Sequence, residues 1–414
     1  MSEPTKNFGT TRGLPREFIA ISFCISLFCA CAYGDSSPSV EIAEVSDYIE
    51  AIDLVEAEHS AYSQQLSDLY LGLGRAFVVQ QDFERAKRAF EQGMQVERIN
   101  NGLYSISQRP YLLSLADTEG FLGNWKQSRN ALNNLYFINR QTYGDGDPRL
   151  LPVLDEILSW MLKTYEQRTV NGGYENLIVA ERIGETIDEI LTNDANGNPV
   201  EKSTRYKKLA ALHYKIANHI RQHGDKNNSE ISFATGEPSA NNRRLTSSHL
   251  HYQRGKRALE KVVETLVSQN SNNHQDQALA IAKLGDWYLM FGQRKAAKQA
   301  YKLALDTLGT PEDSENIEGQ KAALFDNPSI IKFDIEDADA HTVTEETIEV
   351  AMTVSPAGTV SDIEVINSQQ EISKKQLSNL RRNLRSMRLR PRLEDGAPVT
   401  SSHSELFSLS ILDR

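Results

Sequence analysis

Cysteine is nearly absent from this chain of 414 residues, and its three copies stand close together near the N-terminus, at Cys24, Cys29 and Cys31. Beyond these positions the sequence offers no disulfide, no reactive thiol and no cysteine ligand for a metal. The folded part of the chain must therefore be stabilised by a hydrophobic core and not by covalent or metal cross-links.

The sequence motifs of the common enzyme classes are missing as well. It contains no G-x-S-x-G nucleophile elbow, no Walker loop, no H-E-x-x-H zinc motif and no dinucleotide fingerprint. The formal net charge of −11 argues against nucleic acid as the main partner, because phosphate backbones are bound by basic surfaces. We therefore expect a protein that is not an enzyme, needs no cofactor and does not bind nucleic acid.

One uncharged apolar run, from Phe18 to Tyr33, follows a basic N-terminal stretch and contains the small-residue sequence Ala30-Cys31-Ala32. This arrangement is typical of a secretory signal peptide cleaved after Ala32. It predicts a signal peptide at 1–32, a linker at 33–46 and export to the periplasm. Two alternatives stay open: the run is retained as a membrane anchor with the protein facing the periplasm, or Cys31 carries a lipid.

A seven-position pattern occurs twice in the body of the chain with identical spacing. The first copy is Tyr70, Leu73, Gly74, Phe77, Ala86, Phe90 and Gly93, and the second is Ile281, Leu284, Gly285, Tyr288, Ala297, Tyr301 and Ala304. Small residues such as Gly74 and Ala86 suit two helices that cross closely, with large residues on either side filling the seam. The pattern resembles the tetratricopeptide repeat, which is a helical hairpin.

Apolar residues at helical spacing extend this interpretation over residues 47–310. Further helices are expected within 110–140 and at 149–165, 174–191, 204–223 and 245–267. Asp147 precedes Pro148 as an N-cap. We expect about five hairpins stacked into a solenoid, whose concave surface holds a protein partner. Four tyrosines are candidates either for that surface or for packing between hairpins: Tyr62, Tyr104, Tyr136 and Tyr206.

The composition changes after Gly309. Residues 311–327 are predicted to be a linker, and the apolar period then switches from that of a helix to that of a strand. Strands are expected near Ile330, Ile348 and Val360 and around Phe407, with an amphipathic helix from Ile372 to Met387. Residues 328–414 thus read as a small α+β unit in the order strand, strand, helix, strand, strand. The whole chain is predicted to be mainly α.

Two stretches of this C-terminal unit resemble the TonB C-terminal domain family. Val350-Ala-Met-Thr-Val-Ser-Pro-Ala-Gly358-Thr-Val-Ser-Asp-Ile-Glu-Val365 looks like the first hairpin of that domain. Arg388-Leu-Arg-Pro391, followed by Asp395-Gly396 and the strand at Phe407, looks like its closing half. The resemblance implies binding to a partner by strand addition at a sheet edge, through backbone hydrogen bonds and without a catalytic side chain.

From this resemblance we expect protein partners, namely outer-membrane receptors or components of a TonB system. Residues expected to contact a partner are Phe407 and Leu409 in the last strand and a basic stripe, Arg381, Arg385 and Arg388, that faces an acidic partner, lipid head groups or only solvent. The apolar run holds no histidine, and a helical region replaces the proline-rich spacer of an energy transducer. An accessory adaptor is therefore favoured over a direct transducer, with a general envelope-assembly scaffold as a further alternative.

Two patterns that imitate ligand sites are interpreted as structural. His219 and His223 stand four residues apart on a predicted helix, but no third metal ligand is suggested nearby. Asp194 to Asn198 imitates the start of a calcium loop, yet Pro199 and Arg205 occupy the positions that need glycine and an acid. We expect no metal at either place.

Overall fold

The structure is a computed structural model that describes residues 44–167, 173–223, 247–268, 274–309, 317–333, 347–368, 372–394 and 396–408. Residues 44–414 belong to one compact unit. The predicted signal segment with Cys31, most of the 33–46 linker, and Leu409 lie outside the described residues. Within the described residues, no helix combines the length and apolarity that a membrane span requires.

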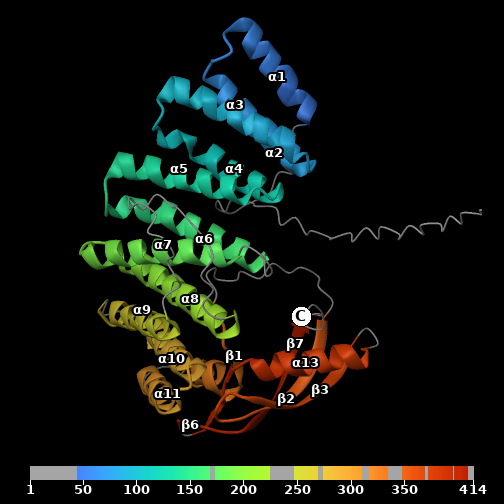
Figure 1. The fold of residues 1–414 in the computed structure, drawn as a ribbon. Coiled ribbons are helices and arrows are strands. Elements are labelled where there is room, and N and C mark those ends of the chain that lie inside the picture. Colours follow the sequence, from blue (N-terminus) through green and yellow to red (C-terminus); the bar gives the residue numbers. More distant parts are fainter. Residues whose placement is uncertain are drawn as a thin grey trace, which may run out of the picture. The chain divides into compact units, whose positions relative to one another are not determined.

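The first part of the described chain is helical. Its helices are α1 (Val45–Glu58), α2 (Gln65–Val79), α3 (Phe83–Asn101), α4 (Arg109–Phe121), α5 (Trp125–Tyr143), α6 (Leu151–Gln167), α7 (Gly173–Asn193), α8 (Pro199–His223), α9 (Ser248–Ser268), α10 (His274–Met290) and α11 (Arg294–Leu308). After α1 they pair into five hairpins, from α2–α3 to α10–α11, and each hairpin contacts the next in chain order (Figure 1). The predicted array of about five stacked hairpins is confirmed.

The repeated pattern marks the points where the two helices of a hairpin approach each other. A Cβ atom placed on Gly285 of α10 would lie 2.5 Å from Cε1 of Tyr301 on α11, and one placed on Gly74 of α2 would overlap the ring of Phe90 on α3. Phe90 and Tyr301 occupy the same position of the pattern and are fully buried. The glycines are therefore required because an aromatic ring fills the space of a side chain.

Local capping sets where several helices begin. The carboxylate of Asp147 accepts a hydrogen bond from the backbone N–H of Arg149 at 2.8 Å, which confirms the predicted N-cap. Helix α8 begins five residues before the predicted start at 204. The side chain of Asn198 accepts a hydrogen bond from the N–H of Val200 at 2.9 Å, and Pro199 suits the first helical position.

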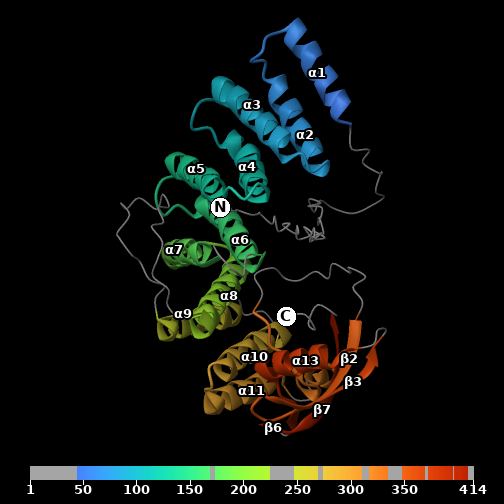
Figure 2. The same cartoon turned by 45° about the vertical axis from the view of Figure 1, so that its right-hand side comes forward.

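The C-terminal module is built on a three-stranded antiparallel sheet with the order β3–β2–β7. Its strands are β2 (Thr347–Val354), β3 (Val360–Ser368) and β7 (Ser401–Ser408), and helix α13 (Lys374–Ser386) lies against one face (Figure 2). Two-residue strands pair as β1 (Ser329–Ile330) with β4 (Leu389–Arg390) and β5 (Leu393–Glu394) with β6 (Ala397–Pro398). This small α+β region with antiparallel strands agrees with the predicted fold class.

Alternate residues of β2 form the core of the module. Ile348, Val350, Met352 and Val354 are buried and share one cluster with Leu380 and Leu384 of α13. The helix is amphipathic as predicted: Leu380 and Leu384 are buried, and Leu377 and Met387 are partly buried.

The described part of the predicted 311–327 linker is folded against the hairpins. It forms α12 (Ile317–Lys321) and a π-helical turn (Ala322–Asp326), and Phe325 in that turn is 1% exposed, with its ring centroid 6.2 Å from that of Tyr301. Phe333 continues this contact, since its ring lies 5.2 Å from Trp287 and 5.1 Å from Tyr214. Phe325 and Phe333 therefore belong to the hydrophobic core of the hairpins, whereas the sheet and α13 enclose a separate core.

Candidate functional site

Strand β7 is a regular edge strand of the module. Its eight residues pair with β2 in unbroken register, from Ser401 opposite Val354 to Ser408 opposite Thr347. Within the described residues no second strand pairs with its other side. A row of backbone N–H and C=O groups at such an edge can accept an incoming strand.

The other edge of the same sheet is irregular. The pairing of β3 with β2 shifts register twice, and Asp362 adopts a positive φ of 48°. Bulges of this kind twist an edge and interrupt its hydrogen-bonding row. Of the two edges, β7 is therefore the better template for an added strand.

The side chain of Phe407, predicted to contact a partner, lies in the core of the module. It is 8% exposed and pairs across the sheet with Ile348. Its side chain is therefore not available at the surface of this edge. The neighbouring Leu406 is 65% exposed and was not singled out by sequence reasoning, although strict alternation with a buried Phe407 would have placed it on the opposite face.

The predicted basic stripe lies on the outer side of α13. Arg381 and Arg385 are exposed, whereas Arg388, just after the helix, is half-buried and donates a hydrogen bond to the carbonyl of Met387 at 2.9 Å. The helix begins with a capping box, in which Ser373 and Gln376 bond reciprocally. Two of the three predicted arginines, Arg381 and Arg385, therefore share one exposed helix face, and the third lies beyond the end of the helix.

Arg390, the second arginine of the Arg388-Leu-Arg-Pro391 stretch, is buried although it stands next to the basic stripe in the sequence. It is 5% exposed, and its guanidinium donates two hydrogen bonds to Asp286 of α10, Nε to Oδ1 at 2.9 Å and Nη2 to Oδ2 at 2.6 Å. The hydroxyl of Tyr301 donates to Oδ1 of the same carboxylate at 3.0 Å. Burial and the adjacent Asp286 raise the pKa of Tyr301 well above its ordinary value, so it stays a donor.

This Arg390–Asp286–Tyr301 cluster attaches the module to the last hairpin. Tyr301 belongs to the repeated pattern, and Asp286 directly follows its crossing glycine, where the first copy has the exposed Arg75. The second arginine of the Arg-x-Arg-Pro stretch is therefore an internal anchor. The sequence did contain an indication of this contact: an acidic residue, Asp286, stands at a repeat position that faces the next element along the chain.

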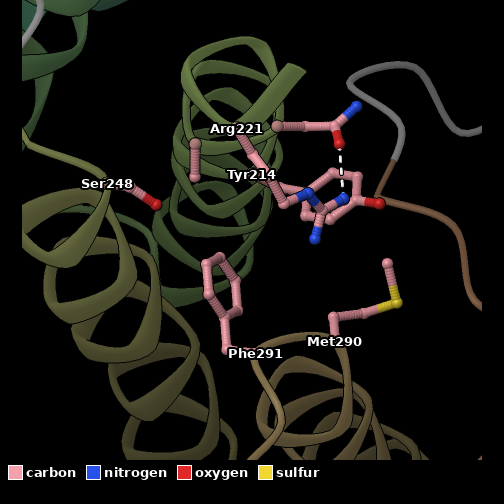
Figure 3. Close-up of a pocket in the computed structure, with 7 residues that line it drawn as sticks. Tyr214, Arg221, Ser248, Met290 and Phe291 are labelled. Carbon is pink, nitrogen blue, oxygen red and sulfur yellow. Dashed lines mark hydrogen bonds between the residues drawn. The ribbon is translucent and has the colours of Figure 1, made fainter. Parts of the chain in front are cut away.

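An aromatic-lined cavity of about 270 Å³ lies between α8, the start of α9 and the end of α10 (Figure 3). Tyr214, Met290 and Phe291 line it together with Arg221, whose Nη2 donates to Oδ1 of Asn218 at 2.6 Å. A neighbouring cavity of about 530 Å³ shares Ser248 and Phe291 with it. The lining of the second cavity also includes His249 and Tyr252.

Polar contacts join successive hairpins, and many charged side chains of the hairpin helices take part in them. Arg205 of α8 pairs with Asp155 of α6 at 2.9 Å, Arg109 of α4 pairs with Glu156 of α6, and the indole of Trp160 donates to Asp117 of α4 at 2.8 Å. Of the four candidate tyrosines, Tyr136 and Tyr206 are buried and pack between helices, while Tyr62 and Tyr104 are exposed. Only the latter pair can contact a partner.

Residues of the two imitated ligand sites make contacts with other side chains of the described chain. The ring of His219 is 4.9 Å from that of His223, but Nδ1 of His219 lies 3.1 Å from the hydroxyl of Tyr165. No group of three metal-binding side chains occurs among the residues that the structure describes. Arg205, at the position of a calcium-loop acid, makes the ion pair with Asp155 instead.

No known family model matches this chain, and no curated protein matches it. Among solved structures it is similar to BtubC (BKLC) from P. vanneervenii, at 12% identity over 68% of this chain and 94% of that chain, with a TM-score of 0.36. It is also similar to a candidate kinesin light chain of Podosopora anserina with nearly identical TPR-like repeats, at 15% identity, 60% and 99% coverage and a TM-score of 0.35. A point variant of that protein gives 15% identity, 60% and 98% coverage and a TM-score of 0.34.

The arrangement of elements defines the class of the molecule. It is a mainly helical protein of tandem tetratricopeptide-like hairpins, followed by a small strand-rich region with antiparallel sheets.

Proposed function

We propose that this chain is a protein–protein interaction adaptor without catalytic activity, an accessory component of a TonB-type envelope transport system in the periplasm. Its hairpins hold one partner, and the β7 edge of its module holds another by strand addition. Proteins built from tandem hairpins generally bind other proteins, because the stacked hairpins present an extended surface without catalytic groups.

The observation that carries this proposal is the difference between the two edges of the β3–β2–β7 sheet. Strand β7 keeps register with β2 throughout, whereas β3 is interrupted by bulges. Natural sheets commonly protect a long regular edge against pairing. An edge left regular beside a protected one is consistent with use as a binding site.

The assignment to envelope transport rests on the sequence. The likeness of residues 350–365 and 388–391 to the TonB C-terminal domain supports a partner among outer-membrane receptors or TonB components. The predicted signal segment at 1–32 supports a periplasmic location. The structure contributes the edge at which such a partner would add.

The experiment is photo-crosslinking in cells from position 404, with the photoreactive residue replacing the exposed Ser404 of β7. Capture of an outer-membrane receptor or a TonB component at this position is expected. The matched control carries the same group at the exposed Glu364 of β3 and should capture neither. Equal capture from both strands, or none from position 404, would refute strand addition at β7.

Two rival functions make different predictions. A direct energy transducer requires an uncleaved anchor, so a mature protein that begins near Tyr33 would exclude it. A general envelope scaffold does not use the module as a binding element. In that case, deleting residues 328–414 would leave the function of the full-length protein unchanged.

A further inference from the structure

Helix α13 carries positive charge that nothing in the described chain neutralises. Its basic residues Lys374, Lys375, Arg381, Arg382 and Arg385 are all exposed, and the helix contains no acidic residue. None of the five forms an ion pair among the described residues. By contrast, several arginines on the helical hairpins are paired with carboxylates, namely Arg109, Arg129, Arg205 and Arg254.

The positions of these charged residues lower the stability of the helix itself. Lys374 and Lys375 occupy its first two positions, where the positive end of the helix dipole favours acids. Arg381 and Arg385 stand four residues apart, so like charges face each other along the helix. The helix is held instead by its capping box and by the buried Leu380 and Leu384. Among the described residues, folding therefore does not account for these charges.

We propose that the outer face of α13 binds an acidic segment of a partner protein. Guanidinium groups pair with carboxylates in bidentate geometry, and three of the five cations are arginines. The helix of 13 residues is about 20 Å long, so its row of charges matches a linear chain. This surface is separate from the β7 backbone edge and extends the proposed function to a second contact on the module.

A membrane surface fits the same face less well. Helices that lie in a membrane interface insert apolar side chains, and the leucines of α13 are enclosed in the core of the module. The exposed residues of the helix are lysines, arginines and serines, with no aromatic or aliphatic side chain among them. An acidic polypeptide needs only the charges, which are present.

The test measures binding of the full chain to a labelled peptide in which glutamate alternates with serine, using a glutamine–serine peptide as the neutral probe. Replacing three exposed arginines, R381Q, R382Q and R385Q together, should weaken binding of the glutamate peptide about tenfold, as expected for three exposed ion pairs. Added salt should weaken wild-type binding, because the contact is electrostatic. All substituted side chains are exposed, so the unfolding curve should not change.

The matched control removes the same charge from α11. Arg294, Lys295 and Lys298 are also exposed, and the variant R294Q, K295Q, K298Q should bind the peptide as the wild type does. Equal loss in both variants would show a non-specific charge effect and overturn the proposal. Binding to phosphatidylglycerol vesicles that depends on the α13 arginines, without peptide binding, would assign the face to a membrane and overturn it as well.

Discussion

The Arg390–Asp286 ion pair is the best-buried charged contact between the module and the hairpins. The two side chains are 6% and 1% exposed, and they come from positions 104 residues apart. Buried ion pairs contribute little net stability, but removing one partner leaves a charge without compensation. We therefore expect the cluster to hold the module on the last hairpin, and we expect its loss to destabilise this attachment strongly.

We expect Arg390→Met to lower the free energy of opening of the module by about 3 to 5 kcal/mol, because Asp286 stays buried and unpaired. Hydrogen exchange of β2 and α13 measures this opening. The control is Arg392→Met, which breaks an ion pair with Glu394 in which both side chains are about half exposed and should change the value by less than about 1 kcal/mol.

A double variant separates the effect of the ion pair from the effect of side-chain packing. Adding Asp286→Leu to Arg390→Met removes the orphaned charge, so the double variant should be more stable than the single Arg390→Met protein. A double variant that is less stable than either single change would show that both side chains are needed for shape alone.

A second buried pair predicts how stability depends on pH. Nδ1 of His213 on α8 lies 3.0 Å from Nδ1 of His251 on α9, and both rings are buried. Burial, and then the nearby Arg254, lowers the pKa of His251 to about 4, and burial with the charges of His251 and Arg254 lowers that of His213 well below its ordinary value. Oε1 of Glu181 lies 3.6 Å from Nε2 of His251 and also pairs with Arg254, which in turn pairs with Glu185.

Because these pKa values fall below that of an unfolded histidine, the unfolded state takes up protons first on acidification. Stability is therefore fully present above about pH 6.5 and is lost as the pH falls toward 4. At about pH 5 the loss should reach about 2 kcal/mol for His251. His251→Gln should flatten the pH dependence of hydrogen exchange in α8 and α9. His249→Gln, an exposed histidine of the same helix, should leave it unchanged.

At the scale of elements, the hairpins could be predicted because their pattern is local. Gly74, Ala86 and Phe90 lie within 17 consecutive residues, and the second copy repeats their spacing, so one crossing geometry explains both. Arg390 could not be placed in the same way. The burial of Arg390 depends on Asp286 in a helix that is distant in the sequence. Without knowledge of that contact, a stretch rich in arginine is predicted to be exposed.

The crossing glycines give a prediction for the elements. Gly74→Ala and Gly285→Ala should each cost about 1 to 2 kcal/mol, because a methyl group meets a buried aromatic ring and outweighs the better helix propensity of alanine. Thermal unfolding and hydrogen exchange of the affected hairpin measure the loss. In Gly120→Ala of α4 the nearest atom would be 3.5 Å away, so this control should be neutral or stabilising by up to about 1 kcal/mol.

The residues between the hairpins and the module show where composition misleads. The stretch 311–327 was predicted to be a linker because it is polar and acidic at its start. Its described part instead buries Phe325 against Tyr301. One aromatic residue in a polar stretch shows no apolar periodicity, so neither a helix nor the contact with Tyr301 could be predicted from it.

For the molecule as a whole, the packing of the region after α11 against the last hairpins predicts that this region caps the C-terminal end of the array. Phe325 and Phe333 cover aromatic residues of the last hairpins, and Leu393 belongs to the same cluster. A terminal repeat without a cap exposes its apolar face to water. Stability along the array is carried by contacts between neighbours, so the effect of removing a cap should decrease with distance from it.

Ending the chain after residue 309 should therefore loosen the array from its C-terminal end. Without Phe333, Phe325 and Arg390, the rings of Trp287 and Tyr301 and the carboxylate of Asp286 lose their cover. Hydrogen exchange should quicken at least tenfold in α10 and α11, corresponding to about 1.4 kcal/mol. Helices α2 to α5 of the same truncated protein serve as the internal control and should keep their protection. Uniform protection along the whole array would show that the hairpins do not need the module as a cap.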